Sequence, residues 1–316
     1  DFATDPALPQ RSAHVYGALA DLELRQGHLR AAASYWQKDI AAIHDQDNWG
    51  KLPAPILGWA FIRHGELLYE WNRLEEARDE LERGLERAEL GGDTRAMIAG
   101  YLLASRLSLA VGDLDGAEGY VSRAAALVER ARYPEWLSRV DRVQALVLAQ
   151  RNDAAEALAW CRQLEFGDAL RNRPDNQEAF LALAQLLIQF GGESDRQRVR
   201  AVLADQRLVA EAEGRRGIQV EALALTAIER QVGGDERAAL LAFDRALRLA
   251  ETEHPIRLLI DFGPPVRRLL ERSWQRGARS DYGSLPLAAS TQAPAMPEDR
   301  LVEPLTTLAE LRTQIA

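Results

Sequence analysis

Three residues of one predicted helix have side chains suited to holding a small polar ligand. Trp59 and Tyr69 offer flat apolar ring faces, and Glu66 offers a carboxylate that accepts hydrogen bonds. Their spacings of seven and three residues place them on one strip of the helix. Such a strip can stack on a sugar ring or a peptide side chain and bind its hydroxyl or amide groups.

The same strip continues on neighbouring predicted helices, where it is polar. Arg106 occupies the position of Glu66 one repeat further on, and Arg142 and Gln185 occupy strip positions in the next two repeats. These residues complete the set of ligand-binding candidates. The competing interpretation makes Trp59 a packing residue between repeats and makes Glu66 and Arg106 an ion pair across a repeat boundary.

No catalytic or metal-binding constellation is visible in the sequence. It has no Ser/His/Asp set, no paired-carboxylate motif and no glycine-rich phosphate loop. The five histidines are scattered, and the single cysteine, Cys161, excludes both an intramolecular disulfide and a cysteine-based zinc site. We therefore predict a binding protein rather than an enzyme, with no catalytic residues and no metal ligands.

Charge and hydropathy narrow the class of partner. Lysine and arginine number 39 against 48 aspartates and glutamates, which gives a net charge of -9. A nucleic-acid backbone requires a basic surface, so we expect no direct nucleic-acid binding. No apolar run is long enough to span a membrane. The start at Asp1 has neither a methionine nor a signal segment, which indicates a cytoplasmic fragment of a longer chain.

A short bend followed by Leu-x-x-Ala or a close variant recurs along the chain and sets the positions of the candidates. Glycine and asparagine tolerate the left-handed conformation that ends one helix before its antiparallel partner begins. The bend markers, at spacings of 45, 40, 40, 39 and 43 residues, are Gly27, Asn72, Gly112, Asn152, Gly191 and Gly234.

Small residues flank these markers at fixed distances, which lets the paired helices approach closely. Seven residues before the markers stand Ala20, Gly65, Ser105, Ala145, Ala184 and Ala227. Five residues after all but the fifth marker stand Ala32, Ala77, Ala117, Ala157 and Ala239. Pro55, Pro134 and Pro174 precede their markers by 17, 18 and 17 residues, as expected for the first turn of a helix.

This pattern is that of a tetratricopeptide-type helix pair with a period nearer 40 than 34 residues. It predicts an all-α fold, a right-handed superhelix of about six TPR-like helix pairs that stack into an elongated α-solenoid. We assign residues 1–282 to this superhelix. Residues 283–300 are rich in Pro, Ser and Ala and are predicted to be a linker.

Several segments together resemble one known family. They are residues 68–77, residues 182–188, and residues 261–265 following the Arg-Leu pair at 257–258. Their order and spacing are similar to the MalT-like helical-repeat sensor region of the large ATP-dependent LuxR-type transcriptional regulators. The resemblance covers roughly residues 10–274.

In that family the sensor superhelix follows an NTP-hydrolysing module and a winged-helix region and precedes a linker and a DNA-binding helix-turn-helix. The resemblance therefore implies that the ATP site lies on an N-terminal module outside this chain, which has no cofactor site of its own. Residues 301–306 resemble the lead-in to the helix-turn-helix, but residues 307–312 depart from it. Residues 301–316 are thus a partial or degenerate lead-in.

The resemblance also implies a function. The superhelix is expected to sense a signal by binding a small inducer or an inhibitory partner protein in its concave groove, and the full-length regulator is expected to self-associate. The alternative is a free-standing TPR scaffold that binds a peptide segment in the same groove. The two hypotheses differ in the occupant of the groove, which is a compact solute or protein surface in one and an extended chain in the other.

Overall fold

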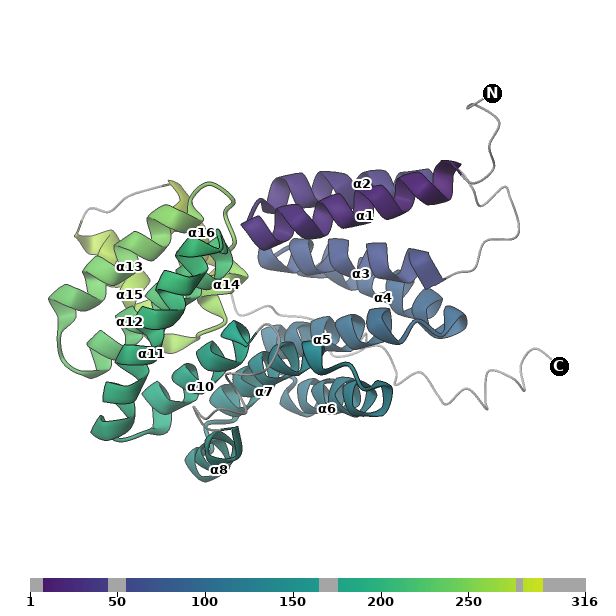
Figure 1. Ribbon diagram of the computed structural model, residues 1–316. Helices are drawn as coiled ribbons and strands as arrows, with labels where there is room; N and C mark the ends of the chain where they lie inside the picture. Colours follow the sequence, from purple (N-terminus) through teal and green to yellow (C-terminus); the bar gives the residue numbers. More distant parts are fainter. Residues whose placement is uncertain (1–7, 45–54, 165–175, 277–280, 292–316) are drawn as a thin grey trace.

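The computed structural model describes residues 8–44, 55–164, 176–276 and 281–291, and within them it contains α-helices, one 3-10 helix and no strand. Helices pair in sequence along most of this part of the chain (Figure 1). The first three pairs are α1 (Leu8–Gln26) with α2 (Leu29–His44), α3 (Pro55–Glu70) with α4 (Leu74–Gly91), and α5 (Thr94–Val111) with α6 (Leu114–Ala131).

The next three pairs continue the stack, and three shorter helices follow them. The pairs are α7 (Leu137–Arg151) with α8 (Ala154–Leu164), α10 (Gln177–Phe190) with α11 (Glu193–Ala212), and α12 (Arg216–Val232) with α13 (Glu236–Ala250). The short helices are α14 (Arg257–Ile260), α15 (Pro264–Gln275) and α16 (Asp281–Thr291). The prediction of an all-α solenoid of about six helix pairs is confirmed for the described residues.

The predicted bends are the turns of the helix pairs. The left-handed φ predicted for the bend markers is found at five of them, Gly27, Asn72, Gly112, Asn152 and Gly234. Gly191 is the exception, because its φ is -78° and its backbone is extended. There the chain turns through two consecutive glycines, and the Asp195 carboxylate accepts the Gly192 N–H at 3.0 Å to cap α11.

The small residues on both sides of each bend form the seam between paired helices. The alanines predicted for the seam are fully buried, as is Ser105, whose hydroxyl donates to the Ala117 carbonyl at 2.8 Å. A Cβ added to Gly65 would lie 3.2 Å from the Ala77 carbonyl oxygen. Buried apolar clusters follow this seam from α1 to α16, so the core runs through the stack.

Proline positions agree with the predicted helix starts where the structure describes them. Pro55 begins α3, and Pro134 begins the 3-10 turn η3 (Pro134–Trp136) that leads into α7. Pro174 lies outside the described residues. The missing N–H of proline is tolerated at these positions because the first turn of a helix leaves its N–H groups without intrahelical acceptors.

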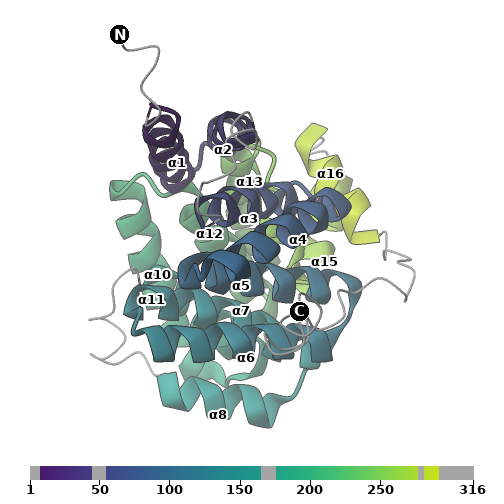
Figure 2. The same cartoon turned by 90° about the vertical axis from the view of Figure 1, so that its right-hand side faces the viewer.

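The stack is less extended than the sequence predicts, because it curls until its two ends touch. α1 contacts α12, and α3 contacts α14. Figure 1 shows α14 next to the ends of α1 and α3, and Figure 2 shows α12 and α13 behind α3 in the perpendicular view. We call residues 251–262 the closing segment, since this stretch joins the last helix pair to α3.

The closing segment is fixed to the end of α3 by backbone and side-chain hydrogen bonds. The Ile256 N–H donates to the Glu70 carbonyl at 2.7 Å, and Trp71 Nε1 donates to the Glu253 carbonyl at 2.9 Å. From the first helix pair, the Arg30 N–H donates to the Glu253 carboxylate at 3.0 Å. The solenoid is therefore closed rather than open-ended.

The start of the predicted linker is a helix. α16 covers residues 281–291, and Tyr282 on it is fully buried, with its hydroxyl donating to the Pro255 carbonyl at 2.7 Å. The linker predicted for 283–300 is corrected at this point, because α16 packs behind the closing segment. The remainder of that range and residues 301–316 lie outside the described residues.

Candidate functional site

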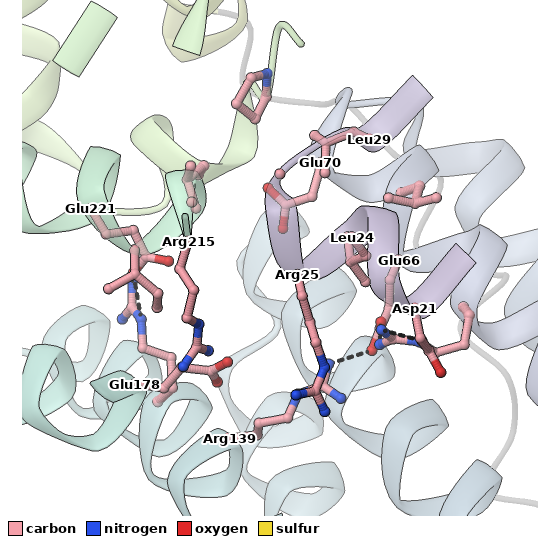
Figure 3. A pocket seen from close by; sticks show the side chains of 18 of the residues that line it. Asp21, Leu24, Arg25, Leu29, Glu66, Glu70, Arg139, Glu178, Arg215 and Glu221 are labelled. Carbon is pink, nitrogen blue, oxygen red and sulfur yellow. Dashed lines mark hydrogen bonds and ion pairs between the residues drawn. The ribbon is translucent and has the colours of Figure 1, made fainter. Parts of the chain in front are cut away.

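Closure of the stack forms an open hollow of about 1380 Å³, which we call the central basin. Its walls come from the first helices of all six pairs, α1, α3, α5, α7, α10 and α12, and from the closing segment. Figure 3 shows Arg25 and Glu66 from the N-terminal helices facing Glu178, Arg215 and Glu221 from the C-terminal ones, with Arg139 of α7 below. This is the concave groove of the sequence prediction, closed on one side.

The basin is strongly charged. Nine arginines and eleven aspartates or glutamates line it, together with the rings of Trp59 and Trp136 and more than a dozen aliphatic side chains. Such a wall suits a polar ligand, since a charged group binds strongly where burial has removed competing water.

Glu66 lies at the centre of a group of arginines. Arg139 Nη2 donates to its carboxylate at 2.9 Å, and Arg63 forms a second ion pair with it. Burial acts to raise the pKa of Glu66, but the charges of Arg63, Arg139 and Arg106 outweigh burial and lower that pKa below its ordinary value. Glu66 is therefore an ionised carboxylate at the basin wall.

The predicted ion pair between Glu66 and Arg106 does not form. Arg106 Nη2 instead donates to Glu70 Oε1 at 2.7 Å and lies 3.3 Å from Asp261 Oδ2. Both residues do line the basin, as their equivalent repeat positions predict. The closing segment supplies Asp261 as an alternative partner, and the repeat pattern contains no information on where that segment packs.

Tyr69 is not on the basin wall. It is 1% exposed, and the guanidinium groups of Arg106 and Arg257 lie 4.2 and 4.9 Å from its ring centre. Its hydroxyl donates to Asp261 at 2.9 Å and accepts from Arg257 at 3.1 Å. The Tyr69 ring, which was predicted to stack on a ligand, is therefore in contact with the arginine side chains of the protein itself.

Trp59 satisfies parts of both interpretations. It is half-buried, packs edge-on against Trp136 with ring centres 6.1 Å apart, and lines the basin. Arg63 lies over its ring at 5.4 Å, and Arg139 lies over the Trp136 ring at 4.8 Å. The two tryptophans and two arginines form one continuous wall beside Glu66.

Arg142 and Gln185 contact each other, although only Arg142 lines the basin. Arg142 donates to Gln185 Oε1 at 2.7 Å and pairs with Glu221 at 2.8 Å. Burial raises the pKa of Glu221; Arg142 opposes that shift, whereas the like charges of Glu178 and Glu70 add to it. Gln185 therefore positions Arg142 from behind the wall.

Asp39, a carboxyl on α2 that lines the basin, is not among the residues predicted from the sequence. Asp39 is 3% exposed, and its Oδ1 has no hydrogen-bond partner among the described residues. Burial raises its pKa to about 7. A signal for it exists in the repeat, because the residue twelve positions after every other marker is glycine, alanine or leucine.

The remaining chemical candidates give no second site. Cys161 is buried, and burial raises the pKa of its thiol to about 12, so it is a poor nucleophile. Within residues 8–44, 55–164, 176–276 and 281–291, no group of His, Cys, Asp and Glu is arranged to hold a metal ion. In the same part of the chain, no helix is long and apolar enough to cross a membrane.

Comparison with known proteins agrees with this architecture. The HTH-type transcriptional regulator MalT of Yersinia enterocolitica is 27% identical over 147 residues, which cover 46% of this chain and 16% of that protein. The protein of the same name from Yersinia pestis (strain Pestoides F) is 26% identical over an equal length. The match thus spans about a sixth of each relative's length.

The family comparison covers far more of the chain than either relative does. A family model described as the MalT-like TPR region matches residues 5–276, which include the six helix pairs, the closing segment and α15. The chain therefore belongs to the family of MalT-like TPR regions.

Proposed function

We propose that this chain is the signal-sensing region of a larger cytoplasmic transcriptional regulator and that the central basin binds its effector. The observation that carries the proposal is the composition of the basin wall. Helices α1 and α3 supply one side, α10 and α12 supply another, and the closing segment joins them. One bound molecule would contact both ends of the solenoid at once.

A ligand in this position has a physical means of signalling. A ligand shifts a conformational equilibrium only as far as its affinities for the two states differ. An effector that bridges the N-terminal and C-terminal walls binds the closed solenoid better than one whose ends have separated. The relative position of the solenoid ends would then change when a ligand binds in the basin, and this change would reach the modules attached to them.

The other modules of the regulator belong to the same proposal. We expect ATP binding on a module N-terminal to this chain and DNA binding on a helix-turn-helix C-terminal to it. The net charge of -9 favours a role for this chain in regulation rather than in direct nucleic-acid contact. An inhibitory partner protein and self-association of the full regulator are also consistent with a solenoid surface.

Closure of the solenoid favours a compact occupant over the alternative of an extended peptide. In an open groove a peptide lies along the first helices, and its ends leave freely. Here the closing segment meets α3, with Ile256 N–H bonded to the Glu70 carbonyl, and bounds the groove. A small molecule fits a basin of about 1380 Å³ without opening this contact.

The test begins with a thermal-shift screen of metabolites and candidate partner proteins, because a ligand that binds the native state raises the melting temperature. For each compound that stabilises the chain, we expect Trp59→Ala to weaken binding at least tenfold. Truncation of this half-buried ring should also cost roughly 2 kcal/mol of stability.

The matched control is Trp160→Ala on α8, which removes another half-buried tryptophan that does not line the basin. It should lower stability without changing affinity. Equal effects of the two variants on affinity would contradict binding in the basin. A screen without any stabilising compound or protein would contradict the sensing role itself.

A further inference from the structure

The first helix pair departs from the repeat at a position where every other pair has a small or apolar residue. Asp39 stands twelve residues after the bend marker Gly27. The equivalent residues of the other pairs are Gly84, Ala124, Leu164, Leu203 and Ala246. All of these are buried or half-buried in the stack, so a carboxyl at this position is not required to build a helix pair.

A second departure occurs on the partner helix. Gly17 stands ten residues before the marker, on the concave face, where the other pairs have Ile62, Leu102, Arg142, Leu181 and Ala224. A Cβ added to Gly17 would lie 3.5 Å from Asp39 Oδ2 and 3.3 Å from the Trp36 ring. The glycine therefore lets the Trp36 ring and the Asp39 carboxyl approach α1 closely, and both Gly17 and Asp39 line the basin.

Among the residues that the structure describes, Asp39 also has no cation of its own. It is 3% exposed, its Oδ1 lacks a partner among the described residues, and burial raises its pKa to about 7. A buried carboxylate without a partner is strongly unfavourable, so the group is kept neutral unless a positive charge reaches it. A buried acidic residue that pairs with arginines, such as Glu66, is instead held in its ionised form.

Among the described residues, no charged group of α1, α2 or α3 forms an ion pair with Asp39, although Arg25 of α1 lines the same basin. On α1, Asp21 pairs with Arg63 of α3 at 3.3 Å. On α3, His64 lies 3.3 Å from Glu80 and 3.4 Å from Gln37. On α2 itself, the Lys38 ammonium lies over the Tyr35 ring at 5.1 Å.

We propose that the effector presents a protonated amine to Asp39, at the part of the basin wall that Gly17 and Asp39 line together. This inference rests on the proposed function of the basin and specifies the chemical class of its ligand. The ammonium group forms an ion pair with the Asp39 carboxylate, and the half-buried ring of Trp59 provides an aromatic wall in the same basin.

The affinity of the basin for an amine is expected to depend on pH. The amine pairs with the ionised form of Asp39, so binding below pH 7 must release the carboxyl proton. Affinity should therefore rise as the pH increases from 5.5 to 8, and a buffer with a large ionisation enthalpy should reveal the released proton in calorimetry. Asp39→Asn should abolish both the pH dependence and the proton release.

The test compares three ligands of matched length by titration calorimetry at pH 8: 1,4-diaminobutane, butane-1,4-diol and succinate. We expect the diamine to bind at least tenfold more tightly than the diol and succinate not to bind. Asp39→Asn should weaken diamine binding at least tenfold. Asp205→Asn, which removes an exposed carboxylate of α11 away from the basin, should have no effect.

A second variant tests the space rather than the charge. Gly17→Ala retains Asp39 but places a methyl group beside its carboxyl, so it should also weaken diamine binding. Melting curves of all variants establish that they fold. Equal binding of the diamine and the diol, or diamine binding that survives Asp39→Asn, would overturn the proposal. A neutral or anionic compound that binds the basin instead would reject the amine and leave the sensing function intact.

Discussion

Two acidic residues of the basin wall, one buried and the other half-buried, have opposite surroundings. Asp261 of the closing segment contacts Arg257 at 2.8 Å, Tyr69 at 2.9 Å and Arg106 at 3.3 Å. Asp39 on α2 has no such partner among the described residues. The pairing of Asp261 explains its burial by a structural role, whereas the burial of Asp39 has no such explanation.

Burial of a charge therefore does not by itself indicate a binding site. A buried ion-pair network stabilises the arrangement that brings its members together, because removal of one partner leaves the others uncompensated. A buried carboxyl without a partner destabilises the empty protein. The first is expected at a junction of the fold, and the second where a ligand supplies the missing charge.

The largest expected effect concerns Asp39. Its folded-state pKa of about 7 exceeds the model-compound value of 3.8, so the unfolded state loses its proton first as the pH rises. Folding stability should thus fall by up to about 4 kcal/mol between pH 4 and pH 7 on account of this group. Urea unfolding across this range should show that loss in the wild type.

The matched variants separate Asp39 from other titrating groups. Asp39→Asn should lack this component of the pH dependence and should be more stable than the wild type at pH 7. Asp205→Asn should follow the wild-type profile. Parallel profiles for the wild type and Asp39→Asn would show that Asp39 is ionised and compensated in the folded protein, and the contrast with Asp261 would disappear.

The next largest effect concerns Asp261. Asp261→Ala leaves Arg257, Arg106 and the Tyr69 hydroxyl without a shared acceptor, so we expect a loss of about 3 kcal/mol in the free energy of unfolding. Small-angle scattering should also show a larger radius of gyration as the closing segment separates from α3. An unchanged midpoint of denaturation would show that the junction does not depend on this network.

The smallest effect concerns one neutral hydrogen bond of the same junction. Trp71→Phe removes the donor to the Glu253 carbonyl and should cost about 1 kcal/mol, measured by chemical denaturation. Because this bond involves no charge, its loss should not vary with pH. A pH-dependent loss would mean that the junction and the Asp39 wall are coupled.

The repeat could be predicted from sequence because its bends and seams depend on residues that are close together along the chain. Gly27 or Asn72 marks a bend by its backbone conformation, and Ala77 or Ala117 marks a seam by its size. Gly191 was predicted to be left-handed but is extended, because composition alone does not distinguish a left-handed turn from an extended one. The helix at residues 281–291 was missed because its composition resembles that of a linker.

The site could be predicted only in part. Helical spacing correctly placed Trp59, Glu66, Arg106 and Arg142 on the concave wall. The same spacing assigned Tyr69 and Gln185 to that wall, but neither lines the basin. The closing segment covers Tyr69 with Arg257 and Asp261. No periodicity within the repeats specifies where a segment nearly two hundred residues later will pack, so this part required the structure.

Closure of the solenoid has a consequence for how the chain unfolds. In an open array each repeat touches only its neighbours, so fraying can start at either end and advance one repeat at a time. Here hydrogen bonds join residues 182 and 192 positions apart in sequence. Such distant contacts form late, because closing a long loop costs entropy that grows with its length. Once formed, they link the ends and favour one cooperative transition over stepwise melting.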